Sequence, residues 1–366
     1  MKRLEGLDAL RGLAIAAMIV ANLQSVALDT YHPVALRIIG SIAAPLFILL
    51  SGFMVSVTST RHSFRYYLLN RGAWIIGVGM LVDITVWQIY PAMSCEVLYL
   101  IGVSVPVAYL ASKLRSGYRI ALIAAIIGLS PVLRHLFGYT YFPGEFYLAG
   151  GKVMEVQGQT GILNHWFVDG WFPLFPWLAF SLVGVEIGQW FKKTERGEFD
   201  LRLILSGLLL TQIGVLSYFF AYPETFIRSI WSEFFYPPTV QYVALALGVS
   251  ILLLLLFLSM PRRGLSLFGP LRTMGRVSLG LYFTHLCLIV YPVTWISGGW
   301  WQVSLKWYAV AYFSILISMW AIAKVYDLLQ PRWGDLIGKG ARAVVAAAIL
   351  AVPVGLLMGY FEWPKG

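Results

Sequence analysis

The feature that most constrains this chain is a series of apolar segments, each about 20 residues long, that recurs along its 366 residues. A helix of about 20 apolar residues is long enough to cross the hydrocarbon layer of a bilayer. A transmembrane β-barrel would instead alternate apolar and polar residues in segments of about ten. We therefore expect an all-α, polytopic membrane bundle with about 11 transmembrane helices. The expected spans lie near residues 9–29, 35–58, 72–90, 95–112, 118–137, 172–191, 201–222, 239–259, 275–296, 305–327 and 342–361.

Composition excludes the main alternatives to a membrane protein. Hydrophobic residues make up 59% of the chain and charged residues only 12%, about half the charged share of a soluble protein. Such a chain is neither an ordinary water-soluble enzyme nor a disordered protein. Its two cysteines do not provide a disulfide scaffold. The first apolar segment contains Asn22 and Gln24 and lacks a clean cleavage site, so we interpret it as a span rather than a signal peptide. We expect one transmembrane domain over residues 1–366.

The basic residues indicate how the helices are oriented, because positive charge is enriched on the cytoplasmic side of membrane proteins. With the N-terminus in the cytoplasm, 21 of the 27 Lys and Arg residues fall on the cytoplasmic side and 6 on the outer side. The net charge of +10 is therefore not a nucleic-acid signal. Two explanations stay open. The charge reflects the topology rule alone, or it also attracts an anionic ligand such as a nucleotide or coenzyme A (CoA).

Polar residues inside apolar segments are the best leads to function, because they are costly to insert into a bilayer. The first predicted hairpin is the richest place. Asp8 and Arg11 are three residues apart on one helix face, so they form a structural ion pair or leave Arg11 to meet phosphate. Asn22 and His32 follow, and Pro45 frees a backbone carbonyl in the next helix. A neutral imidazole such as His32 is well suited to proton transfer near neutral pH.

Weaker leads lie further along the chain. Asp83 and Glu96 fall in or near predicted spans, and with His285 they suggest an alternative function as a proton-coupled transporter. His285 itself is either bonded to a neighbouring helix or part of a ligand site. His165 and Asp169, four residues apart, share one face if their segment is helical. They end a predicted outer loop at about 138–171, and long ordered loops are often functional. No metal-ligand spacing occurs, so we expect no metal.

Several short motifs resemble the transmembrane acyltransferases related to heparan-α-glucosaminide N-acetyltransferase, and those from Val97 onward resemble the prokaryotic branch of that family. The last of them is also similar to the wider O-acyltransferase family of bacterial envelopes. The motifs are Arg3-x4-Asp8-Ala-Leu-Arg11-Gly, Asn22, His32, Ile42-Ala-Ala-Pro45-Leu-Phe47, Leu50-Ser51-Gly52-Phe53, Val97-Leu-Tyr-Leu-Ile-Gly102, Phe172-Pro-Leu-Phe-Pro-Trp177 and Gly275-Arg-Val-Ser278-Leu-Gly-Leu-Tyr282-x2-His285.

The resemblance implies a reaction and a catalytic pair. Family members take an acyl group, usually acetyl, from cytoplasmic acyl-CoA and pass it to an amino or hydroxyl group, typically of a sugar, on the far side. His32 occupies the place of the family's essential histidine, and Asn22 that of the family's asparagine. We therefore expect an acetyltransferase in the cytoplasmic (inner) membrane of a prokaryote, with acetyl-CoA as co-substrate and a sugar or envelope glycan as acceptor. A homodimer is left open.

Further residues are expected to contact the two substrates. The expected CoA contacts are Arg11, Arg61, Arg71, Arg276 and His285. The expected acceptor contacts are His165, Asp169 and Arg37.

Overall fold

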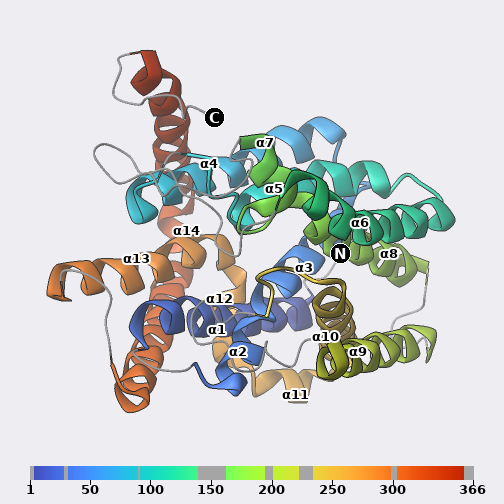
Figure 1. Ribbon diagram of the computed structural model, residues 1–366. Coiled ribbons are helices and arrows are strands. Elements are labelled where there is room, and N and C mark those ends of the chain that lie inside the picture. The colour runs from blue at the N-terminus through green and yellow to red at the C-terminus, as the bar shows by residue number, and fades with distance from the viewer. Residues whose placement is uncertain are drawn as a thin grey trace. The chain divides into compact units, whose positions relative to one another are not determined.

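The computed structural model is helical over most of the chain that it describes (Figure 1). It describes residues 4–28, 32–89, 91–138, 162–193, 201–221, 234–297 and 303–357. Within these ranges the only extended pairing is an isolated bridge between Leu28 and Val303. The predicted all-α polytopic bundle is confirmed.

The chain divides into two compact units. Unit 1 comprises Met1–Phe47 and Arg196–Pro331, and unit 2 comprises Ile48–Glu195 and Arg332–Gly366. The helices of unit 1 are α1 (Glu5–Ala27), α2 (Val34–Gly40), α9 (Leu201–Ala221), α10 (Val240–Ser259), α11 (Arg262–Ser266), α12 (Gly269–Arg276) and α13 (Ser278–Ser297). Those of unit 2 are η1 (Tyr66–Ala73), α4 (Trp74–Val82), η2 (Asp83–Trp87), α5 (Val97–Ala111), α6 (Ser116–Phe137), α7 (Ile162–Asn164), η3 (His165–Asp169) and α8 (Leu174–Lys193). Two helices, α3 (Ala43–Thr58) and α14 (Leu305–Leu357), contribute to both units.

Eight helical segments among the described residues are long and apolar enough to cross a membrane. The count reaches nine if α12 and α13, which meet at a bend of 96°, form one span. Most predicted spans have a helix at nearly the predicted position, but α5 is shorter than a full span. The predicted number of crossings and the cytoplasmic N-terminus stay predictions, as do the single domain and the homodimer.

The two predicted C-terminal spans, 305–327 and 342–361, are not separate helices in the structure. Residues 305–357 form one helix of 53 residues, α14. The polar stretch expected to be a loop continues the helix, and an ion pair of 2.9 Å between Asp335 and Lys339 supports it at i,i+4 spacing. The glycines of this stretch, Gly334, Gly338 and Gly340, do not end the helix. Each lowers helix stability by only about 1 kcal/mol relative to alanine.

Helix α1 is the centre of unit 1, where it packs against α2, α10, α12 and α13 (Figure 1). Its contact with α12 is made backbone to backbone. A Cβ added to Gly12 would collide with the carbonyl oxygen of Leu271, and one added to Gly275 would collide with that of Asp8. Both glycines belong to the motifs that carry the family resemblance. Their missing side chains therefore set the distance between α1 and α12.

Alanine at Gly12 is expected to destabilise the protein, because the new methyl group has no space and must push α12 away from α1. Overpacking of this kind costs about 1–3 kcal/mol. We expect Gly12→Ala to lower the melting temperature of the purified protein measurably. Gly280→Ala is the matched control, since nothing lies within 4 Å of a Cβ added there. Equal melting temperatures for Gly12→Ala and Gly280→Ala would contradict this account of the α1–α12 contact.

Candidate functional site

Asn22 on α1 and His285 on α13 lie side by side in unit 1. The Nδ2 atom of Asn22 is 2.9 Å from Nε2 of His285, which is wholly buried. The Nδ1 atom of His285 is in contact with the carbonyl oxygen of Tyr282, one turn earlier on α13. A carbonyl oxygen only accepts hydrogen bonds, so Nδ1 carries the ring proton. The bare Nε2 atom therefore accepts a hydrogen bond from the amide of Asn22.

Two apolar clusters flank this polar pair. On one side, Ile15, Met18 and Ile19 of α1 pack with Leu281 of α13. On the other side, a second cluster joins Leu23 and Ala27 of α1 to Ile289 of α13 and Tyr308 of α14. The hydrogen bond thus lies in a low-dielectric environment, where it is stronger than in water. The interpretation of His285 as a buried histidine bonded to a neighbouring helix is confirmed.

His32 lies just before α2 and is buried. Burial lowers the pKa of His32 from its usual 6.5, and the nearby charge of Arg37 lowers it further. Arg37 lies on α2, is wholly buried, and places its guanidinium carbon 4.6 Å from the centre of the Phe234 ring. His32 is therefore neutral at neutral pH, the form in which an imidazole accepts a proton.

Polar contacts fasten the end of α2 to the segment that precedes α10. The backbone N–H of Phe234 donates to the hydroxyl of Ser41 over 3.0 Å, and the hydroxyl of Tyr242 donates to the carbonyl of Ser41 over 2.7 Å. Sequence reasoning did not find these residues, because the partners are about 200 positions apart and none stands in a motif. Their effect is to hold α2, and with it Arg37, in place.

On the side predicted to be cytoplasmic, two of the expected CoA contacts form ion pairs. Arg11 lies 3.0 Å from Asp8, which confirms the predicted ion pair, and Arg276 lies 2.7 Å from Asp327. Arg61 and Arg71 are exposed and belong to unit 2. A role in CoA binding stays a prediction for all four arginines.

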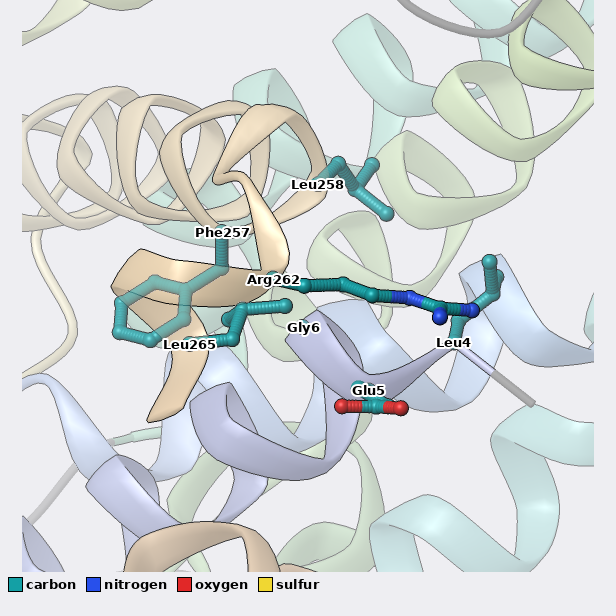
Figure 2. Close-up of a pocket in the computed structure, with 7 residues that line it drawn as sticks. All are labelled: Leu4, Glu5, Gly6, Phe257, Leu258, Arg262 and Leu265. Carbon is teal, nitrogen blue, oxygen red and sulfur yellow. The ribbon is translucent and has the colours of Figure 1, made fainter. Parts of the chain in front are cut away.

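A hollow of about 140 Å³ lies at the first turn of α1 (Figure 2). The residues that line it are Leu4, Glu5, Gly6, Phe257, Leu258, Arg262 and Leu265. Figure 2 shows the side chain of Arg262 extended past Gly6 toward Leu4. No side chain of the described residues caps the N-terminus of α1, and Glu5 is paired with Arg272. Sequence reasoning did not single out Arg262, since one arginine among many at span ends gives no separate signal.

In unit 2, His165 and Asp169 form a buried pair. The Nδ1 atom of His165 lies 2.8 Å from a carboxylate oxygen of Asp169, one turn later in η3. The prediction that both residues share one helical face is confirmed. The carboxylate accepts a hydrogen bond from Nδ1, so only the Nε2 atom of the His165 ring is left to meet another group. This atom is buried and has no hydrogen-bond partner among the described residues.

Asp83, also in unit 2, has a structural role in the segment that precedes α5. Its carboxylate accepts hydrogen bonds from the backbone N–H of Ala92, the hydroxyl of Ser94 and the hydroxyl of Tyr99, at 3.0, 2.8 and 2.6 Å. Ala92 has a positive φ of 70°, an unfavourable conformation for a residue other than glycine. The buried carboxyl group therefore stabilises a strained turn between η2 and α5. Glu96, also buried, begins α5.

Comparison with known families assigns the chain. The family model for the catalytic domain of heparan-α-glucosaminide N-acetyltransferase matches residues 3–223, more than half of its length. The chain belongs to this family. Together with the apolar helices, membership identifies a multi-pass membrane acetyltransferase. Among proteins of curated function, none matches the chain.

The family match covers some of the predicted site residues and not others. Asn22, His32, Arg37, His165 and Asp169 all lie within residues 3–223. His285 and Arg276 lie beyond it, as does Arg262 of the hollow. The family match therefore did not point to the contact between Asn22 and His285, which is visible only in the structure. Within the described ranges, no three His, Cys, Asp or Glu side chains gather in a way that would hold a metal ion.

Replacement of Arg37 is expected to raise the pKa of His32. In the wild-type protein, burial and the Arg37 charge both disfavour the imidazolium, so the midpoint of His32 titration lies below 6.5. Arg37→Met removes the charge and should raise the midpoint of His32. Arg37→Lys keeps the charge, so its midpoint should stay below that of Arg37→Met. NMR of protein labelled at its 5 histidines, with His32→Ala for assignment, measures both midpoints. An unchanged or lower midpoint in Arg37→Met would contradict the assigned cause.

Proposed function

We propose that the protein transfers an acetyl group from acetyl-CoA on the cytoplasmic side to an amino or hydroxyl group of a sugar or envelope glycan on the outer side. We place it in the cytoplasmic membrane of a prokaryote. The observation that carries this proposal is the buried, neutral His32. It lies between α1, which bears Asn22, and α2, and both residues fall within the matched acetyltransferase region. The two side chains are of the types that acyl transfer requires.

In the direct form of the reaction, His32 acts as a general base. It accepts the proton of the acceptor as that nitrogen or oxygen bonds to the thioester carbon. The carbon–sulfur bond then breaks, and the proton passes from His32 to the departing thiolate of CoA. In the two-step form, a ring nitrogen of His32 attacks the thioester carbon and the carbon–sulfur bond breaks, which releases CoA as its thiolate. The acceptor nitrogen or oxygen then bonds to the acetyl carbon, the bond from that carbon to the imidazole breaks, and the acceptor's proton neutralises the thiolate. Asn22 orients the thioester carbonyl or the imidazole in either form.

The donor is expected to bind through its phosphates. CoA carries several negative charges, and the excess of Lys and Arg on the predicted cytoplasmic side attracts them. The hollow at the start of α1 supports a phosphate contact, because it combines the N-terminus of a long helix, which no described side chain caps, with the side chain of Arg262. Arg11, Arg61, Arg71 and Arg276 are the further arginines that we propose for this role.

For the acceptor, we propose contacts with His165, Asp169 and Arg37. The Nε2 atom of His165, which has no partner among the described residues, supports this assignment, because a buried ring nitrogen gains from a hydrogen bond to a sugar hydroxyl, which can donate or accept. Asp169 fixes the ring that presents this atom. Arg37 carries a buried positive charge close to His32.

The catalytic role of His32 is tested with purified protein and labelled acetyl-CoA. We expect the wild-type protein to bind acetyl-CoA and to release CoA slowly by thioester hydrolysis. His32→Ala should still bind but release CoA about 100-fold more slowly, the usual scale of a lost general base. A trapped acetyl-histidine would select the two-step form, and its absence the direct form. If neither the wild-type protein nor His32→Ala binds or hydrolyses acetyl-CoA, the proposal is contradicted.

The phosphate contact at the hollow is tested separately. Arg262→Gln should weaken acetyl-CoA binding about 3- to 10-fold, the range expected for one charge-assisted hydrogen bond. Arg263→Gln is the matched control, because this neighbouring arginine is also exposed but does not line the hollow. Isothermal titration with acetyl-CoA measures both dissociation constants. An equal loss in the two variants would show a general charge effect instead of a contact at this site.

A further inference from the structure

The contact between Asn22 and His285 fixes more than the distance between two helices. An asparagine amide has two faces, a carbonyl oxygen that only accepts and a nitrogen that only donates, and it rotates between two orientations. His285 also has two states, because either ring nitrogen carries the proton. The structure restricts both choices through one chain of hydrogen bonds that begins at the carbonyl of Tyr282.

The chain of bonds runs in one direction. The carbonyl of Tyr282 requires the proton of His285 to be on Nδ1, and the bare Nε2 atom then requires a donor. The donor is Nδ2 of Asn22 at 2.9 Å, so the amide oxygen of Asn22 is turned away from α13. The His285 ring cannot easily move, because it is wholly buried and its centroid lies 5.3 Å from that of the Tyr282 ring in an edge-to-face contact.

Asn22, by contrast, is only half-buried. One of its two N–H groups is bound to His285, and its amide oxygen accepts no hydrogen bond from the described residues. The exposed part of the amide therefore presents an oxygen and a second N–H group in a fixed orientation. A fixed amide of this kind is what a reaction needs from a group that orients a carbonyl or an imidazole, because misplacement by about 1 Å costs up to about 100-fold in rate.

We propose that His285 is a positioning residue for acyl transfer: it holds the amide of Asn22 in the one orientation that serves the reaction, and it does not bind CoA. The inference rests on the proposed function of Asn22, and it assigns to His285 a role different from the CoA contact expected from sequence. Both of its nitrogens are engaged by the protein, which leaves no donor for a phosphate.

Two replacements of His285 separate positioning from packing. His285→Phe keeps a flat ring but offers no acceptor, so the amide of Asn22 is free to turn. His285→Gln offers a carbonyl oxygen near the place of Nε2 and should restore the hydrogen bond. Thr284→Val is the matched control on α13, because among the described residues the hydroxyl of Thr284 bonds to the carbonyl of Gly280 in its own helix and to no neighbouring helix.

We expect His285→Phe to lower the rate of CoA release at saturating acetyl-CoA about tenfold or more, with the dissociation constant of acetyl-CoA changed less than about threefold. His285→Gln should regain most of the lost rate, and Thr284→Val should match the wild type. A weaker affinity with an unchanged saturating rate would make His285 a CoA contact and overturn the inference. Equal losses in His285→Phe and His285→Gln would assign it to packing and overturn the inference as well.

A double-mutant cycle with Asn22→Ala gives a readout that does not depend on activity. If the two side chains bind each other, the loss of melting temperature in the double variant is smaller than the sum of the single losses. Additive losses would overturn the inference. A wild-type protein without acetyl-CoA turnover would overturn the proposed function even if melting is coupled. Turnover that His285→Phe leaves intact would overturn only the positioning role.

Discussion

The site of this protein depends on how closely the backbone of α1 approaches its neighbours. Gly12 of α1 and Gly275 of α12 leave room for backbone-to-backbone contact, and a methyl group at either position would collide with a carbonyl oxygen. From this contact the chain bends by 96° into α13. Ten residues after Gly275, α13 carries His285, which meets Asn22 ten residues after Gly12. The glycines therefore set the packing on which the polar pair relies.

Several of the polar groups that this chain buries are paired, because an unpaired polar group in an apolar interior is costly. The buried carboxylate of Asp83 stabilises a turn, and the carboxylate of Asp169 orients His165. His32 differs from these residues, since it is held neutral by burial and by Arg37. Pairing thus explains the roles of Asp83 and Asp169, and burial with the nearby Arg37 charge explains the lowered pKa of His32.

Much of the fold could be predicted from the sequence, because a membrane span has a simple signature of length and hydropathy. The first hairpin and the pairs Asp8–Arg11 and His165–Asp169 were also predictable, because their partners lie within one helical turn. Contacts between residues far apart in the sequence could not be predicted in this way. The partner of Asn22 is 263 residues away in the sequence. The continuous helix α14 was missed because its central segment is polar, and hydropathy reports burial in lipid but not whether a helix ends.

The central claim is that acetyl transfer takes place at Asn22 and His32, and a structure with a non-hydrolysable acetyl-CoA analogue tests it most directly. The measurement is the distance from the analogue's acyl carbonyl to the side chains of Asn22 and His32. We expect the carbonyl to lie within hydrogen-bond or near-attack distance of both side chains, at about 3–4 Å. A bound analogue whose acyl group lies out of reach of both side chains would contradict it.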